Sequence, residues 1–323
     1  MAEQRVWVRD LRAGTEVEEI YAVRSCDVRQ RRGGGGYLAL QLGDKTGHVA
    51  ALAWEHVERL RQLCQVGGVV RVRGQVQRYN QRLQVVIRDA IAVEEDEVRE
   101  EHFIRSSSLD ATELWRRLHE FVEEVEDEAL RQLLFRVYSD PEVERLMLRA
   151  PAARSMHHAF KSGLLEHTLS MTAAARLLAG HYSLDASLVV AGALLHDLGK
   201  IWELELGPSI EYTDDGRLLG HLPMEVLFVD RKISEMSAFP AETRRHLLHI
   251  LLSHHGKFEH GSPRRPKTPE ALLVHAMDNL DSKMGAMLQL IEEGGETGEA
   301  WTPYSPILGR HIYRRRPGEK DGE

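Results

Sequence analysis

The spacing of apolar residues changes once along this chain, and the change divides it into two parts. Before a charged, serine-ended segment at 94–108, apolar and polar residues alternate as they do in half-buried strands. After that segment, apolar residues recur at helical spacing. We therefore expect a multidomain chain, with an all-β domain at 1–93, a linker at 94–108, an all-α bundle at 109–313 and a frayed tail at 314–323.

The N-terminal part predicts a small barrel. Leu38, Leu40 and Leu42 alternate as one buried face, and the DKTG turn at 44–47 separates this strand from the next. A short amphipathic helix, EHVERLRQLC, follows, and then come two strands around a turn at Asn80. Five strands with a helix between the third and fourth are the order of an OB-fold, which commonly binds single-stranded nucleic acid.

The charge of the barrel favours a nucleic-acid partner. Residues 1–93 carry 15 Lys and Arg against 10 Asp and Glu, whereas the rest of the chain carries 27 against 40. Polar residues of the fourth strand lie on the face opposite Val70, Val72 and Val76, although an ordinary solvated face gives the same pattern. The candidates for binding RNA or single-stranded DNA are Arg29, Arg31, Arg32, Arg71, Arg73, Tyr79 and Arg82.

The helical part carries histidines and aspartates beside apolar runs. The stretch ALLHDLGK at 193–200 ends a run of small and apolar residues with His196 and Asp197. Burying such groups costs several kcal/mol, on the order of the penalty for a buried ion, unless they are paired or bind a metal. A helix end or a satisfied core histidine explains any one of these residues alone. Together they form the order H…HD…H…HH…D, made of His167, His196, Asp197, His221, His254, His255 and Asp278.

These residue types point to two divalent metal ions. The chain has only two cysteines, Cys26 and Cys64, so a thiolate zinc site is not expected. Imidazole and carboxylate groups suit Mn²⁺ first, with Fe²⁺, Co²⁺, Zn²⁺ or Mg²⁺ as alternatives. An aspartate can bridge two ions about 3.5–4 Å apart, which then activate a water molecule and clamp a phosphoryl group.

The ordered set resembles that of the HD-domain superfamily of metal-dependent phosphohydrolases. Together with the barrel and the stretch HHAFKSGLLEHTLSM at 157–171, it makes the chain similar to the YhaM-type 3′→5′ exoribonucleases of bacteria. The resemblance implies hydrolysis of single-stranded RNA, and of single-stranded DNA as a further substrate, to 5′-nucleoside monophosphates. It also implies a homo-oligomer.

The resemblance also implies individual roles. One metal would be held by His167, His196, Asp197 and Asp278, and Asp197 would bridge to a second metal held by His221 and His254. His255 would complete the second site or contact phosphate. Lys200 resembles the lysine of the HDxGK variant that contacts the scissile phosphate, and a lysine at a helix end is the alternative. His157 and His158 would line the substrate path, with a surface loop as the alternative.

Two other functions stay open from the residues alone. One is a phosphodiesterase or phosphohydrolase of free or cyclic nucleotides; the absence of GYP from HHGKFEHGSP argues against cyclic dinucleotides. The other is a non-catalytic protein that binds single-stranded nucleic acid. We expect no membrane association, because no run of about 20 apolar residues occurs. The low cysteine count and the lack of an apolar signal-peptide core favour the cytoplasm.

Overall fold

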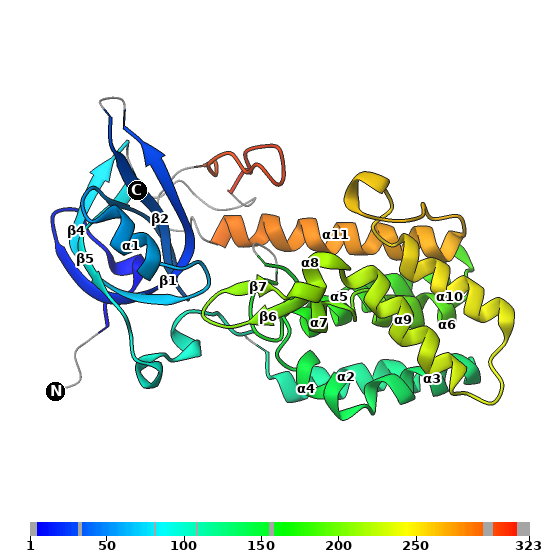
Figure 1. The fold of residues 1–323 in the computed structure, drawn as a ribbon. Helices are drawn as coiled ribbons and strands as arrows, with labels where there is room; N and C mark the ends of the chain where they lie inside the picture. The colour runs from blue at the N-terminus through cyan, green and yellow to red at the C-terminus, as the bar shows by residue number, and fades with distance from the viewer. Residues whose placement is uncertain are drawn as a thin grey trace. The chain divides into compact units, whose positions relative to one another are not determined.

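A computed structural model describes residues 5–31, 34–80, 82–107, 109–154, 158–292 and 300–314 (Figure 1). The chain divides into two compact units. The first extends to Ser106 and includes Leu206–Glu211, and the second comprises Ser107–Glu205 and the chain from Tyr212 onward. The predictions for Arg32, His157 and the tail at 315–323 fall outside the described residues.

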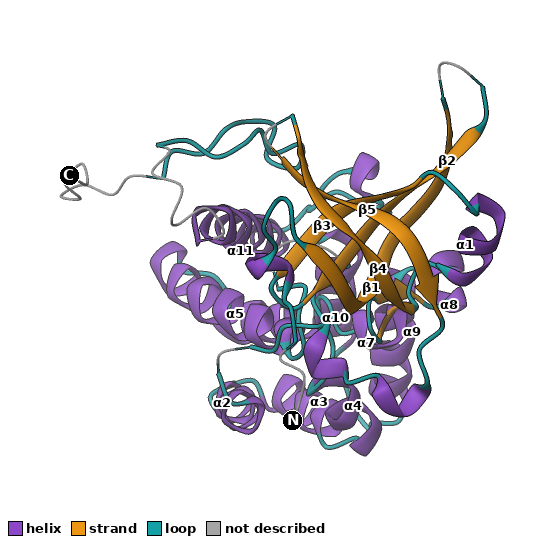
Figure 2. Cartoon of the chain, turned by 90° about the vertical axis from the view of Figure 1, so that its left-hand side faces the viewer, coloured by secondary structure: helices purple, strands orange, loops and turns teal. Residues whose placement is uncertain are grey.

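The first unit contains a closed five-stranded barrel with a helix after its third strand (Figure 2). The strands follow the order β1-β2-β3-β5-β4, in which β3 and β5 pair in parallel and the other neighbours are antiparallel. The predicted OB-fold order is therefore confirmed. The elements are β1 (Glu16–Gln30), β2 (Gly36–Asp44), β3 (Gly47–Ala53), α1 (Val57–Leu63), β4 (Val69–Tyr79) and β5 (Arg82–Ile91).

Alternating residues of the strands fill the barrel, as the pattern predicts. The leucines at 38, 40 and 42 and the valines at 70, 72 and 76 are all buried in its core. The β4–β5 register shifts between Arg73 and Gly74. A Cβ at Gly74 would collide with the backbone oxygen of Val86, so glycine allows these two strands to close the barrel.

The charged segment after β5 packs more closely than its composition suggests. Its described part, 94–107, contains two 3₁₀ helices, Glu95–Glu97 and Glu100–His102. Phe103 is buried against Ile20 and Ala22 of β1, and its carbonyl accepts a hydrogen bond from Arg24 at 2.8 Å. The charged composition of this segment did not reveal the burial of Phe103, because acidic residues surround this one aromatic residue in the sequence.

The second unit is helical, as predicted. Its longer helices are α2 (Ala111–Glu123), α3 (Glu128–Tyr138), α4 (Pro141–Met147), α5 (Gly163–Tyr182), α6 (Ala186–Leu195), α9 (His221–Ser234), α10 (Ala241–Ser253) and α11 (Pro269–Glu292). Between α6 and α9 the structure adds short elements that the sequence did not predict: α7 (Lys200–Glu203), β6 (Leu204–Leu206), β7 (Ile210–Tyr212) and α8 (Asp214–Leu218). Of these, Leu206–Glu211 belongs to the first unit. In the described parts of the chain, none of the helices is both long and apolar enough to cross a membrane.

Helix α6 is the centre of this unit. Every residue from Leu188 to Leu195 is buried, because α3, α5, α10 and α11 all pack against this helix. Its N-terminus is capped by Asp185, whose side chain accepts a hydrogen bond from the Leu188 N–H. A Cβ at Gly192 would lie 2.7 Å from Cγ2 of Ile250, so glycine lets α10 approach closely. The chain therefore emerges from α6 inside the core of the unit.

Candidate metal centre

The HD pair begins where α6 ends. His196 and Asp197 follow Leu195 directly and are fully buried. Gly199, two residues later, lies against the first residue of α9. A Cβ at this position would collide with the backbone oxygen of His221. The glycine of HDLGK thus allows α9 to bring His221 up to Asp197.

The two oxygens of Asp197 face two different groups of histidines. Its Oδ2 atom lies 3.6 Å from Nε2 of His167 and 3.3 Å from Nε2 of His196. Its Oδ1 atom lies 3.5 Å from Nε2 of His221 and 3.7 Å from Nε2 of His254. One carboxylate is therefore shared by histidines from four places in the fold.

The remaining predicted ligands complete these two groups. Asp278, on α11, places Oδ1 3.4 Å from Nε2 of His167 and 3.9 Å from Nε2 of His196. The Nε2 atom of His255 lies 3.2 Å from that of His221. Two groups suited to metal binding result: His167, His196, Asp197 and Asp278, and Asp197, His221, His254 and His255. The structure brings all seven predicted residues together and places His255 in the second group.

The hydrogen bonds behind the rings leave ligand atoms facing the cluster. Nδ1 of His196 bonds the carbonyl of Ala193, and Nδ1 of His254 bonds that of Leu251, each at 2.8 Å. With those protons on Nδ1, each Nε2 carries a lone pair, and among the described residues neither of these buried Nε2 atoms has a hydrogen-bond partner. An unsatisfied buried group costs about 1–3 kcal/mol. Divalent cations would satisfy both atoms, so these residues fit a metal centre.

The charge balance of the cluster also suits cations. Burial lowers the pKa of His221 and His254, and it lowers that of His255 to about 4, so these rings are neutral, as ligands must be. For His167 burial also acts to lower the pKa, but hydrogen bonds to Asp278 and Asp281 outweigh it and raise the value to about 9. Without metal, His167 therefore holds a proton that partly balances the surrounding carboxylates, and the same field attracts metal cations.

Lys200 and His158 both lie beside the cluster. Lys200 donates a hydrogen bond from Nζ to Oδ2 of Asp197 at 2.7 Å, and its side chain is 17% exposed. His158 packs its ring 5.6 Å from that of His167, with Nε2 3.5 Å from Oδ2 of Asp281. These positions are compatible with contacts to substrate, and the roles of both residues remain predictions.

Two buried glutamates near the cluster were not predicted as site residues. Glu203 accepts two hydrogen bonds from His221 at Oε1, from the backbone N–H at 3.1 Å and from Nδ1 at 3.0 Å. Glu225 is fully buried on α9, with Oε1 3.7 Å from Nδ1 of His254. Burial, followed by the charge of Asp197, raises the pKa of Glu225 well above its usual range. The available signal was the helical i,i+4 spacing of His221 and Glu225.

The arginines of the barrel fall into two environments. On β4, Arg71 is paired with Glu97, and Arg73 is paired with Glu18 of β1 at 2.6 Å. These acidic partners reduce the positive charge that the strand pattern suggested. Arg82, opposite Tyr79 at the other end of the β4–β5 ladder, is exposed, and so is Tyr79 itself.

An aromatic surface lies on β2 and at the end of β3. The rings of Tyr37 and Trp54 lie 4.7 Å apart, and the guanidinium of Arg31 covers Trp54 at 4.8 Å and donates to its backbone carbonyl. Arg29, which is exposed, lies opposite Tyr37 in the β1–β2 ladder. Neither aromatic residue was predicted as a binding residue, since their meeting depends on strand register. This surface combines a stacking platform with positive charge.

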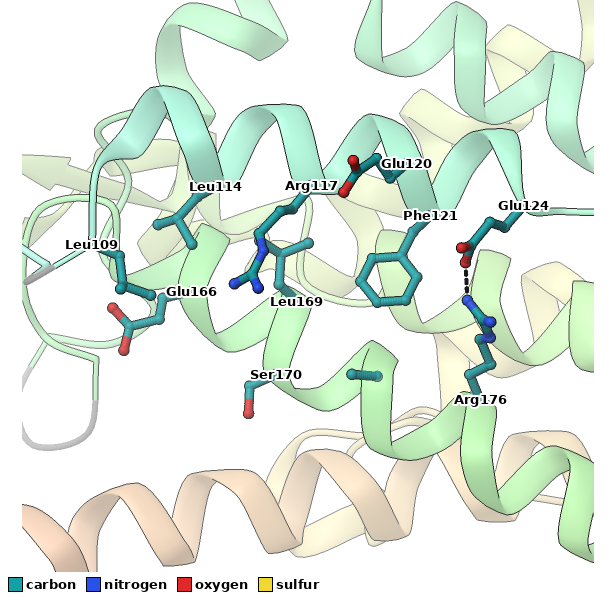
Figure 3. Close-up of a pocket in the computed structure, with 11 residues that line it drawn as sticks. Leu109, Leu114, Arg117, Glu120, Phe121, Glu124, Glu166, Leu169, Ser170 and Arg176 are labelled. Carbon is teal, nitrogen blue, oxygen red and sulfur yellow. Dashed lines mark ion pairs between the residues drawn. The ribbon is translucent and has the colours of Figure 1, made fainter.

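A separate cavity lies between α2 and α5 (Figure 3). Its volume is about 500 Å³, and its walls combine apolar side chains such as Leu114 and Phe121 with the ion pair of Arg176 and Glu124. Its lining includes none of the seven predicted ligands, so it is distinct from the metal cluster. Ser170 lies at its edge and also bonds Asp281.

Two family models match the chain. The model described as "HD domain" matches residues 164–283, and the model described as "OB-fold nucleic acid binding domain" matches residues 19–93. The fold and the shared aspartate thus define a nucleic-acid-binding barrel joined to an HD-type phosphohydrolase domain, the class in which divalent metals support hydrolysis.

Full-length relatives identify the family. A protein of Geobacillus sp. (strain WCH70) named 3′-5′ exoribonuclease YhaM is 33% identical over 94% of this chain and 96% of its own length. A protein of the same name from Bacillus subtilis (strain 168) is 33% identical over 86% of this chain and 88% of its own. The chain belongs to the YhaM 3′-5′ exoribonuclease family. Among solved structures, an OB-fold domain of replication protein A from Methanococcus maripaludis is 16% identical over 28% of this chain and 97% of that chain, with a TM-score of 0.24.

Proposed function

We propose that this protein is a metal-dependent 3′→5′ exoribonuclease that hydrolyses single-stranded RNA to 5′-nucleoside monophosphates and also accepts single-stranded DNA. The observation that carries the proposal is the buried carboxylate of Asp197, shared by two groups of histidines. Membership of the YhaM family supports the reaction and its direction. Hydrolysis of free or cyclic nucleotides is less favoured, because a barrel that binds a strand has no role in it.

The residues of the cluster would serve as metal ligands and as a contact to the phosphate. His167, His196, Asp197 and Asp278 would hold one ion, and Asp197 with His221, His254 and His255 the other. When bound, two divalent ions supply an activated water and neutralise phosphoryl oxygens. The buried walls hold the ligand atoms in fixed directions. Lys200, beside Asp197, would place its ammonium group against the negative charge that develops on the phosphate.

The barrel would hold the strand upstream of the 3′ end. Trp54 and Tyr37 would stack on bases, and Arg29 and Arg31 would contact phosphates. We include Mn²⁺ as the native metal, action in the cytoplasm and a homo-oligomeric state in the proposal. The chemistry of imidazole and carboxylate ligands supports the first, and the family resemblance supports the last.

The test combines RNA labelled at its 5′ end, Mn²⁺ and the isosteric variant Asp197→Asn. We expect the wild-type chain to produce a ladder that shortens from the 3′ end. The variant should lose about 1000-fold or more in rate, since a shared ligand supports both ions and each tenfold loss corresponds to about 1.4 kcal/mol. Asp230→Asn is the matched control. Asp230 is not one of the predicted site residues, and its carboxylate pairs with Arg244 at a distance of 2.6 Å.

Other results would contradict the proposal in distinct ways. Intact RNA together with hydrolysis of free or cyclic nucleotides would indicate the phosphodiesterase alternative. Binding of RNA without turnover at any divalent metal would indicate a non-catalytic binding protein. Fragments that shorten from the 5′ end would contradict the direction.

A further inference from the structure

The four histidines that face Asp197 form hydrogen bonds through Nδ1 to two kinds of acceptor. His196 and His254 bond backbone carbonyls at the ends of their own helices. His167 and His221 instead bond carboxylates, those of Asp281 and Glu203. Each of the two metal-binding groups therefore contains one histidine backed by a carboxylate.

Asp281 is fixed by contacts from a second helix. It lies one turn after Asp278 on α11, and its Oδ2 atom is 2.7 Å from Nδ1 of His167. Its other oxygen accepts a hydrogen bond of 2.6 Å from Oγ of Ser170, which lies one turn after His167 on α5. The two bonds tie α11 to α5 at this point. They leave the Nε2 atom of His167 facing Asp197 and Asp278.

Glu203 fixes His221 through a separate set of contacts. A single oxygen, Oε1, accepts from both the backbone N–H and Nδ1 of His221, at 3.1 and 3.0 Å. These bonds set the first residue of α9 and the plane of its ring together. Glu203 lies on α7 and Asp281 on α11, and the described contacts of the two carboxylates have no residue in common.

We propose that Asp281 and Glu203 are positioning residues, one for each metal ion, which orient His167 and His221 and thereby set the affinities of the two ions separately. The proposal deepens the function given above and rests on its two ions. A carboxylate behind a ligand histidine fixes the tautomer and orientation of the ring and increases its basicity, and its loss typically weakens metal binding about 10- to 100-fold. Asp281 would act on the ion next to Oδ2 of Asp197, and Glu203 on the ion next to Oδ1.

The experiment is a Mn²⁺ titration of the full chain without RNA, with bound metal counted and followed by electron paramagnetic resonance. The wild-type chain should bind two ions and give the signal of an exchange-coupled pair. Asp281→Asn and Glu203→Gln should each keep one ion at nearly wild-type affinity and bind the other about 10- to 100-fold more weakly, so that an uncoupled signal appears. Glu242→Gln, whose carboxylate pairs with Arg245 on the surface, is the matched control and should bind both ions normally.

Circular dichroism of the metal-free chain would reveal whether a variant fails to fold. In that case, a second and milder variant at the same contact would be used. Ser170→Ala would replace Asp281→Asn, because it removes one contact of the carboxylate and keeps both Asp281 and His167; we expect about a threefold loss for one ion. Glu203→Asp would replace Glu203→Gln, since the shorter side chain keeps the charge and loses the geometry.

Several outcomes would overturn the proposal. It fails if the two variants bind both ions like the wild type, if each weakens both ions equally, or if the wild-type chain binds fewer than two ions. Because the titration contains no RNA, it is independent of the assay for the proposed function. A chain that binds two ions with the expected pattern but leaves RNA intact would refute the exoribonuclease and not the positioning roles.

Discussion

The two units of this protein place their charged side chains in opposite settings. In the helical unit, Asp197 is buried and lies within 4 Å of four histidines and Lys200. In the barrel, Arg71 and Arg73 each pair with one glutamate at a solvent-accessible position, and Arg31 lies over the ring of Trp54. A change in the buried cluster should therefore affect every member, whereas changes on the barrel surface should be small and nearly additive.

Among side chains outside the seven candidate ligands, the largest difference should come from Lys200. Removing its charge with Lys200→Met should lower kcat about 100-fold while two Mn²⁺ ions remain bound, because a positioned charge beside the reacting phosphate stabilises the transition state. Lys232→Met is a closely matched control. Lys232 pairs with Asp140 at 3.0 Å and its side chain is 16% exposed, against 2.7 Å and 17% for Lys200. Single-turnover kinetics with saturating enzyme would measure the effect, and an unchanged rate would show that Lys200 is only a helix-end lysine.

A smaller effect is expected from the aromatic surface of the barrel. Trp54→Ala, made in the Asp197→Asn background to prevent cleavage, should weaken binding of a labelled single strand about tenfold, since stacking contributes about 1–3 kcal/mol per base. Fluorescence anisotropy would measure the affinity. Tyr182→Ala removes another exposed aromatic side chain, at the end of α5, and should leave the affinity unchanged. Equal losses in the two variants would contradict a stacking role for Trp54.

The smallest effect separates the two kinds of arginine. Arg31→Gln should reduce the slope of log affinity against log salt by about 0.7, the value for one phosphate contact on a single strand. Arg73→Gln should change the slope much less, because Glu18 already balances its charge. Titrations at several salt concentrations would compare them. If the slope changed more for Arg73→Gln than for Arg31→Gln, the result would indicate that the nucleic acid binds along the β4 face.

The sequence predicted most of the fold because both apolar patterns are long and regular. The strands of the barrel and eight helices follow directly from periods of two and of about 3.6 residues. The elements between Lys200 and Leu218 were missed because each has only three to five residues and depends on contacts elsewhere. Thr213, for example, donates from its backbone to Glu203 and from its side chain to Trp202.

The candidate site was predicted as a set of residues but not as an arrangement. The seven candidate ligands stood out because polar groups at apolar helix ends need a reason to be buried, and these residues do meet in the structure. Glu203 carries no such signal, because its bond to His221 depends on the path of the short elements between them. Likewise, the strand pattern placed Arg73 on an outer face but could not reveal Glu18, which the β1–β4 register brings opposite it.

The position of Asp278 also affects when the cluster of candidate ligands can form during synthesis. This candidate ligand lies on α11, more than a hundred residues after His167, so a nascent chain carries an incomplete set of candidate ligands until this helix has left the ribosome. A ribonuclease is translated from the kind of molecule it degrades. Because α11 supplies Asp278, the growing polypeptide lacks the complete cluster of candidate ligands until residue 278 has been added.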